Sequence, residues 1–249
     1  MKEGRLYGQF WSVYVSCKTN FKDAVDWGLQ QLDITREYVE MYPEFELVND
    51  PWSAKRAMNN GKIASTMGLE GGHMIGSRLA ILRQLFNLGI RYMTLTHNCN
   101  TPWADNNIAD RNIEQVRNDG LSDFGKDVIR EMNRIGMFVD LSHVSTATMN
   151  DALDVSEAPV MFSHSSARAL ASHQRNVPDD VIKRVKENNG VICIGSACKM
   201  YAMFEFNQQN RHILKPFKVW YSGFIVDGFD SSDPSTNPNI THIGKLFLV

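Results

Sequence analysis

Two short runs decide the fold, Met137-Phe-Val-Asp-Leu-Ser-His143 and Val160-Met-Phe-Ser-His164. Each run is apolar and β-prone, and each stops at a Ser-His pair. Between them, Ser145–Asp154 opens with a hydroxyl that can cap a helix, so this segment predicts a helix. Two buried strands joined by one helix form a β-α-β unit whose strands are parallel. Because both strands then end at the same edge of the sheet, we expect His143 and His164 to face one pocket.

The remaining chain repeats this alternation of strands and helices. The pattern predicts strands at 8–16, 63–70, 91–97, 137–143, 160–164 and 191–195, and helices at 21–42, 51–60, 77–88, 122–135, 145–154 and 178–189. A long polar loop is expected at 98–120, and loops of that length are usually functional or disordered. Successive βα units indicate a parallel sheet, either a barrel or an open doubly wound fold.

Several polar residues stand at successive strand ends and favour the barrel. They are Glu70, His97, His143 and His164. No glycine-rich nucleotide-binding signature follows any strand, which weakens the doubly wound alternative. We therefore predict an α/β, TIM-barrel-like fold that is incomplete in this chain. Residues 1–197 are expected to form the partial barrel domain, and residues 198–249 a divergent, partly disordered segment.

Composition sets further limits. The chain has 249 residues, of which 43% are hydrophobic and 22% charged, with a formal net charge of −2. Its scattered basic residues predict no nucleic-acid partner. The chain contains no run of about eighteen apolar residues, so its sequence predicts no membrane span. The polar start, Met1–Gly8, does not resemble a secretory signal, so the chain is either cytosolic or preceded by a signal outside this sequence.

The strand-end residues suggest metal chemistry. Glu70, His143 and His164 offer a carboxylate and two imidazoles, a ligand set suited to a catalytic zinc with an open position. Such a zinc would lower the pKa of a bound water to about 7. His97 lies on the strand between them and could bind substrate or stabilise an oxyanion. We assign the other histidines structural or surface roles: His73, His173, His212 and His242.

Serine hydrolysis is disfavoured, since adjacent strand residues point to opposite faces and Ser142 and Ser163 would not contact the histidines that follow them. The four cysteines form no Cys-x-x-Cys pair. They are expected to be small buried residues, or else Cys17 and Cys99 form a disulfide, which would indicate an oxidising compartment.

Five longer motifs follow one another along the chain. They are Gly68-Leu-Glu-Gly-Gly-His73, Thr94-Leu-Thr-His-Asn-Cys-Asn-Thr-Pro-Trp-Ala-Asp105, Asp140-Leu-Ser-His-Val-Ser145, Phe162-Ser-His-Ser-Ser-Ala167 and Arg175-Asn-Val-Pro-Asp-Asp180. Because these motifs are long and ordered, the chain resembles the zinc-dependent membrane (renal) dipeptidases of animals. The resemblance spans roughly residues 4–195, about three quarters of the chain.

The resemblance implies a distorted (β/α)8 barrel with a two-zinc centre that hydrolyses dipeptides. By position, Glu70 corresponds to the carboxylate that bridges the metals, and His143 and His164 to the other ligands of one zinc. His97 corresponds to the histidine that contacts substrate and the tetrahedral intermediate. Arg175 corresponds to the arginine that pairs with the C-terminal carboxylate of the substrate, a task suited to its planar fork.

The resemblance also implies a Cys17–Cys99 disulfide, a cell-surface or extracellular location, a lipid anchor and a homodimer. The family's His-x-Asp pair, which binds the second zinc, is not found in this sequence. Gly223–Asp227 matches only weakly the family's strand that ends in a further ligand of that zinc. We thus expect one intact zinc site.

The predicted function is a zinc metallopeptidase acting on dipeptides. The alternative is an inactive relative that retains the substrate pocket. Another metal-dependent amidohydrolase is disfavoured because no His-x-His strand appears.

Overall fold

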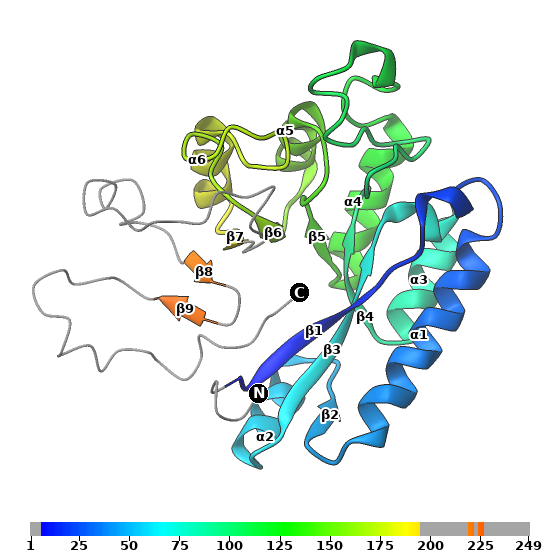
Figure 1. Ribbon diagram of the computed structural model, residues 1–249, viewed down its shortest axis with the longest axis vertical. Helices are drawn as coiled ribbons and strands as arrows, with labels where there is room; N and C mark the ends of the chain where they lie inside the picture. Colours follow the sequence, from blue (N-terminus) through cyan, green and yellow to red (C-terminus); the bar gives the residue numbers. More distant parts are fainter. Residues whose placement is uncertain (1–5, 195–218, 222–223, 227–249) are drawn as a thin grey trace, which may run out of the picture.

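A computed structural model describes residues 6–194, 219–221 and 224–226 (Figure 1). Within these residues the strands form one nine-stranded sheet in the order β1-β3-β4-β5-β6-β7-β8-β9, with β2 paired to β3. All pairs are parallel except β8 with β9. The strands are β1 (Gly8–Val13), β2 (Phe45–Leu47), β3 (Ile63–Glu70), β4 (Ile90–Thr94), β5 (Phe138–Asp140), β6 (Met161–Ser165), β7 (Val191–Ile194), β8 (Val219–Tyr221) and β9 (Phe224–Val226).

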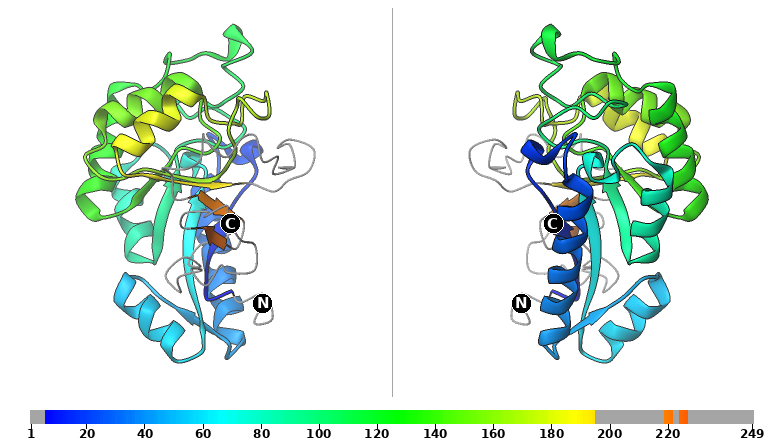
Figure 2. Two further views of the ribbon diagram at one scale, coloured as in Figure 1. Left: turned by 90° about the vertical axis from the view of Figure 1, so that its left-hand side faces the viewer. Right: turned by 90° about the vertical axis from the view of Figure 1, so that its right-hand side faces the viewer.

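Helices connect most successive strands and lie on the outer side of the curved sheet, so that the described part is a parallel half-barrel (Figures 1 and 2). Neighbouring helices pack along the chain, α3 on α4, α4 on α5, and α5 on α6. The helices are α1 (Ala24–Met41), α2 (Pro51–Asn59), α3 (Leu79–Asn87), α4 (Asp123–Ile135), α5 (Thr146–Val155) and α6 (Asp179–Glu187). This arrangement confirms the predicted α/β class and the incomplete barrel.

Local sequence explains where the helices begin and end. Asp50 forms a capping box at the start of α2, its carboxylate accepting from the backbone N–H of Ser53 at 2.8 Å. Ser145 caps α5 by accepting from the N–H of Thr148 at 3.1 Å. Gly136 ends α4 in the left-handed region, at φ +80°. These signals are why the predicted helices closely match the observed ones.

The main hydrophobic core fills the space between the sheet and its helices. It includes fully buried Leu69 of β3, Leu82 of α3 and Ile129 of α4. The other face of the sheet carries a smaller cluster around Phe10 and Tyr92. Tyr92 fits there because Gly68 of the neighbouring strand has no side chain, and a Cβ at this position would collide with the tyrosine ring.

The structure corrects some predicted boundaries. Phe45–Leu47 forms a short strand, β2, that the sequence analysis missed. β4 ends at Thr94 and β5 at Asp140, so His97 and His143 lie three residues beyond their strands. The predicted division at residue 197 and the expected disorder of 198–249 fall largely outside the described residues. Within 198–249 the structure describes only β8 and β9.

Candidate metal centre

Glu70, His143 and His164 meet at the carboxyl edge of the sheet. Glu70 is the last residue of β3, His143 follows β5, and His164 lies in β6. The Oε1 atom of Glu70 is 3.4 Å from His143 Nε2 and 3.3 Å from His164 Nε2. The two Nε2 atoms are 2.8 Å apart. Among the described residues, these three are the one group of His, Cys, Asp and Glu side chains whose possible ligand atoms converge in this way.

A second layer of polar groups orients each of the three side chains. Ser12 donates from its hydroxyl to Glu70 Oε2 at 2.7 Å. Asn98 Oδ1 lies 3.1 Å from His143 Nδ1. Ser163 Oγ lies 2.8 Å from His164 Nδ1. His143 also has a left-handed backbone, at φ +68°, which turns its ring toward the other two ligands.

The donor set fits a cation. Asn98 Oδ1 can only accept, so His143 Nδ1 carries the hydrogen and His143 Nε2 carries a lone pair. If His164 has the same tautomer, two nitrogen lone pairs and the Glu70 carboxylate face one another without a hydrogen between them. Such an arrangement is repulsive unless a positive charge lies among the three groups. Two imidazoles and one carboxylate are suitable zinc ligands.

The electrostatics favour the same protonation states. Burial raises the pKa of Glu70, but the nearby imidazoles of His143 and His164, together with the hydrogen bond donated by Ser12, outweigh it and lower the pKa to about 2. Burial is the main reason why the pKa of His143 falls to about 3, and it also lowers the pKa of His164. At neutral pH the site therefore holds an ionised carboxylate and neutral imidazoles, the forms that bind a metal.

His97 lies beside this cluster. Its Nε2 is 3.7 Å from Glu70 Oε1, and its ring stacks on that of His143 with centroids 4.2 Å apart. The ring of Tyr14 also lies close to that of His97, tilted by 52° at a centroid distance of 4.6 Å. Burial lowers the pKa of His97 to about 4, so its imidazole is neutral at pH 7.

Arg175 reaches the same edge from the loop after β6. Its side chain is almost fully buried, and Nη2 donates to the backbone oxygen of His164 at 3.3 Å. After burial, the positive charge of Arg175 is a further reason for the lowered pKa values of His143 and His164. All five residues singled out from the sequence thus gather at one place.

Where the structure describes the remaining histidines, their positions agree with the structural or surface roles expected for them. His73 is buried and its Nε2 donates to the backbone oxygen of Val15 at 3.1 Å. His173 is half-buried, and its Nδ1 accepts from the backbone N–H of Arg175 at 3.1 Å. His212 and His242, and Asp227 of the faint strand motif, lie outside the described residues.

One prediction about serine was wrong. Ser163 and His164 are adjacent and yet form a hydrogen bond, because the pairing of β6 with β7 shifts register between Phe162 and Ser165. That irregularity turns both side chains to the same side. The Ser163 hydroxyl is nevertheless buried and donates to Asp140 at 2.6 Å, so it is held as a structural partner.

The sequence analysis missed the orienting residues Ser12, Asn98 and Asp140. Asn98 and Asp140 stand one residue after His97 and three before His143, so a search for polar neighbours of each candidate ligand would have found them. Ser12 gives no such signal, because it lies 58 residues from Glu70 in the sequence.

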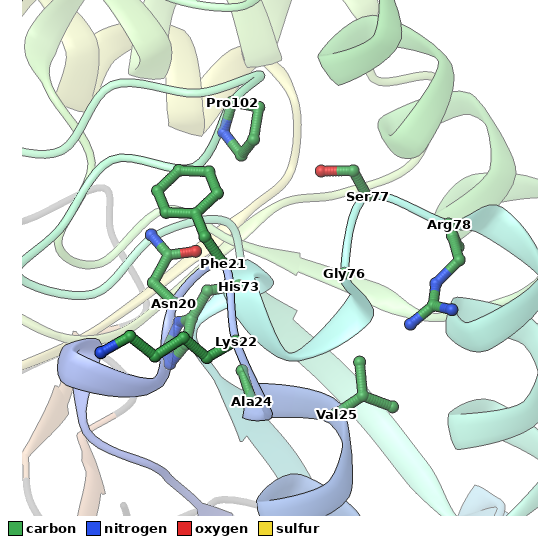
Figure 3. A pocket seen from close by; sticks show the side chains of 10 residues that line it. All are labelled: Asn20, Phe21, Lys22, Ala24, Val25, His73, Gly76, Ser77, Arg78 and Pro102. Carbon is green, nitrogen blue, oxygen red and sulfur yellow. The ribbon is translucent and has the colours of Figure 1, made fainter.

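A separate pocket of about 250 Å³ lies between the start of α1 and the segment before α3 (Figure 3). Phe21 and Pro102 stand near each other on one side, while Lys22 and Arg78 lie on opposite sides. Its lining includes His73 but none of the five residues gathered at the metal centre. The pocket is thus distinct from the candidate metal centre.

Comparison with known sequences identifies the family. Residues 1–243 match the family described as "Membrane dipeptidase (Peptidase family M19)". The chain belongs to the membrane dipeptidase family. Over 194 residues it is 43% identical to mouse (Mus musculus) Dipeptidase 3, a match that covers 78% of this chain and 39% of that protein. The chain therefore spans less than half the length of this relative.

Solved structures show the same fold as this dipeptidase family member. A metallo peptidase from Rhodobacter sphaeroides, bound to a phosphinate mimic of the dipeptide L-Ala-D-Ala, matches with a TM-score of 0.69 and 21% identity, over 80% of this chain and 64% of that one. The probable dipeptidase PvdM from Pseudomonas aeruginosa matches with a TM-score of 0.67 and 24% identity, over 78% of this chain and 51% of that one.

Two further findings concern the cysteines of this dipeptidase family member and the length and polarity of its helices. Cys17 and Cys99 form a disulfide, with their Cα atoms 5.9 Å apart, and Cys193 is a buried free cysteine. The disulfide that the family resemblance implied is therefore present. Within the part of the chain that the structure describes, no helix is both long and apolar enough to cross a membrane.

Proposed function

We propose that this chain acts as a zinc-dependent dipeptidase. The observation that carries the proposal is the convergence of the Glu70 carboxylate with the Nε2 atoms of His143 and His164. Family membership supports a metallopeptidase, and a ligand set of two histidines and one carboxylate is typical of catalytic zinc. A bound zinc ion would supply hydroxide at neutral pH by lowering the pKa of a water to about 7.

In this proposal the side chains at the strand ends have separate roles. Glu70, His143 and His164 hold the metal, while Ser12 and Asn98 keep the first two in position through their hydrogen bonds. Because these partners are fixed by the sheet and its loops, the ligands need little rearrangement to bind the ion.

His97 is proposed to contact the substrate. Since its pKa falls to about 4, it is a neutral donor at pH 7, and its Nε2 already faces the metal cluster. A neutral N–H aimed at this point can stabilise the charge that develops on the carbonyl oxygen of a scissile amide. The stacked ring of His143 and the tilted ring of Tyr14 restrict its rotation.

Arg175 is proposed to bind the C-terminal carboxylate of a dipeptide. Its guanidinium is almost fully buried next to the metal cluster, where a charge-assisted bond to a carboxylate is stronger than in water. A carboxylate site this close to the metal limits how much peptide can follow the scissile bond, which favours dipeptides over longer chains.

The test is to load the purified chain with zinc and measure hydrolysis of Gly-D-Phe. We expect at least one zinc per chain, turnover that disappears on chelation and returns with zinc, and loss of both properties in Glu70→Gln. Absence of zinc binding would overturn the proposal. Zinc binding without turnover would instead support the alternative, an inactive relative that keeps the substrate pocket.

The location of the protein and its oligomeric state belong to the same proposal. The Cys17–Cys99 disulfide supports an oxidising environment, in keeping with a cell-surface or extracellular location. A lipid anchor and a homodimer are further expectations from the family resemblance. Light scattering on the purified chain, with and without reductant, would show whether it forms a dimer and whether that dimer depends on disulfides.

A further inference from the structure

Asp140, at the end of β5, is a fully buried carboxylate surrounded by four donors. Its Oδ1 accepts from the backbone N–H groups of Ser142 at 3.0 Å and Ser163 at 2.9 Å. Its Oδ2 accepts from the hydroxyls of Thr94 and Ser163, each at 2.6 Å. The carboxylate thereby ties together the carboxyl ends of β4, β5 and β6.

This role is needed because the sheet itself is weakly paired there. β5 and β6 are registered at a single position, Asp140 with Met161. Beyond that position, the backbone N–H of Ser163 donates to the carboxylate of Asp140 and not to a backbone carbonyl of the neighbouring strand. The carboxylate therefore fixes where His164, the next residue along β6, is placed.

The hydrogen bonds continue from Asp140 to the metal centre in a defined direction. The Ser163 hydroxyl has one hydrogen, and it points to the carboxylate, which can only accept. Ser163 Oγ must then accept from His164 Nδ1, 2.8 Å away. This leaves the lone pair of His164 on Nε2, which faces Glu70 Oε1 at 3.3 Å. Ser142 helps to hold the same strand end, since its Oγ accepts from the backbone N–H of His164 at 3.0 Å.

We propose that Asp140 is a positioning residue that acts through the hydroxyl of Ser163 to hold His164 in the tautomer with its hydrogen on Nδ1. The inference rests on the proposed role of His164 as a metal ligand. A carboxylate that orients a ligating imidazole is a general feature of metal sites, and loss of such a partner weakens metal binding about 10- to 100-fold. Here a serine hydroxyl carries the effect over one additional hydrogen bond.

Asp140→Asn reverses the direction of this chain. The amide oxygen can keep the two backbone N–H groups, which places the amide nitrogen opposite the hydroxyls of Thr94 and Ser163. That nitrogen donates, so the Ser163 hydroxyl becomes free to donate to His164 Nδ1. His164 then carries its hydrogen on Nε2, directed into the metal site.

The tautomer can be read without any metal. The full chain, labelled with ¹⁵N-histidine and freed of metal, is measured at pH 7 by two-bond ¹H–¹⁵N correlation, with His164 assigned from a His164→Gln sample. We expect hydrogen on Nδ1 in the unmodified chain, hydrogen on Nε2 in Asp140→Asn, and a mixture of both tautomers in Ser163→Ala. Zinc affinity, measured by competition with a chelator, should fall about 10- to 100-fold in Asp140→Asn and less in Ser163→Ala.

Thr94→Val is the matched control. It removes a hydroxyl donor from the same Oδ2 atom but leaves the path to His164 intact. We expect it to keep the Nδ1 tautomer and the zinc affinity of the unmodified chain. If His164 keeps only the Nδ1 hydrogen in Asp140→Asn, or in Ser163→Ala should the first variant not fold, the inference is overturned. An unmodified chain that binds no zinc would refute the proposed function, while the tautomer result would still decide the role of Asp140.

Discussion

Arg168 holds the backbone on both sides of Arg175. Its Nε donates to the carbonyl of Asn176 at 2.9 Å, and its Nη2 to the carbonyl of Gln174 at 3.2 Å. The same Nη2 lies 3.2 Å from Asp110 Oδ2, so the loop that carries Arg175 is tied to the long loop after β4. The position of the proposed substrate-binding arginine thus depends on a second arginine that does not itself face the metal centre.

Arg168→Ala should raise the KM for a dipeptide with a free carboxylate by about tenfold. Each of the two lost carbonyl bonds contributes about 0.5–1.5 kcal/mol, and about 1.4 kcal/mol corresponds to a factor of ten. The value of kcat should change little, because the metal ligands are untouched. Steady-state kinetics on Arg168→Ala and on Arg130→Ala, which breaks only an exposed pair with Asp127, would test this. A fall in kcat with unchanged KM would contradict it.

Arg175→Ala should discriminate between two kinds of substrate. We expect the KM for a free-carboxylate dipeptide to rise about 100-fold, since a buried charge-assisted bond to the carboxylate is worth about 1.5–3 kcal/mol. A substrate with an amidated C-terminus never makes this bond and should be affected far less. Comparing kcat/KM for the two substrates in both enzymes gives the answer. Equal losses would remove Arg175 from its assigned role.

His164→Ala should abolish tight metal retention. Glu70 and His143 would be the ligands left from the cluster, and two ligands hold zinc far less strongly than three. Zinc content after dialysis against a chelator is the measurement. His173→Ala serves as a histidine control, because His173 contacts the backbone of Arg175 and not the cluster. Unchanged zinc content in His164→Ala would count against the assignment.

The sequence allowed the half-barrel to be predicted because its signals are local. Capping residues such as Ser145 and terminating glycines such as Gly136 mark the helix ends within one turn. Strand-end polar residues likewise predicted that Glu70 and His164 would meet. The strand β2 was missed because three half-buried residues carry too little periodicity to be recognised.

Other features depend on contacts that no local pattern contains. The apolar residue Leu141 suggested that β5 continues, but the Asp140 carboxylate takes the N–H of Ser142 and the chain turns. His143 then reaches the site through a left-handed backbone that is rare for any residue except glycine. The bond between the neighbours Ser163 and His164 arises from a register shift in the sheet, which the alternation rule does not include.

Removing the Cys17–Cys99 disulfide should cost a large part of the stability. The bond closes a loop with a sequence separation of 82 residues, for which the chain-entropy model gives about 4–5 kcal/mol. Cys17→Ser combined with Cys99→Ser, followed by urea unfolding, would measure the loss. The buried Cys193→Ser provides a single-cysteine comparison. A double variant as stable as the unmodified chain would show that the bond contributes little to folding.

Glu131 should make the stability depend on pH. Hydrogen bonds from Arg134 and then Arg83 lower its pKa to about 2, and the pair with Arg83 links α4 to α3. In an unfolded chain a glutamate has a pKa of about 4.3. The stabilisation is therefore complete above about pH 5 and disappears as the pH falls from about 4.3 through 2. Since the two arginines are 44% and 63% exposed, screening limits the effect to about 1 kcal/mol.

Urea unfolding of Glu131→Gln and of the unmodified chain at pH 7, 5 and 3 tests this. The variant should be less stable at pH 7, and the gap in unfolding free energy between the two should narrow at pH 3. A gap of constant size would mean that the charge of Glu131 does not stabilise this helix pair.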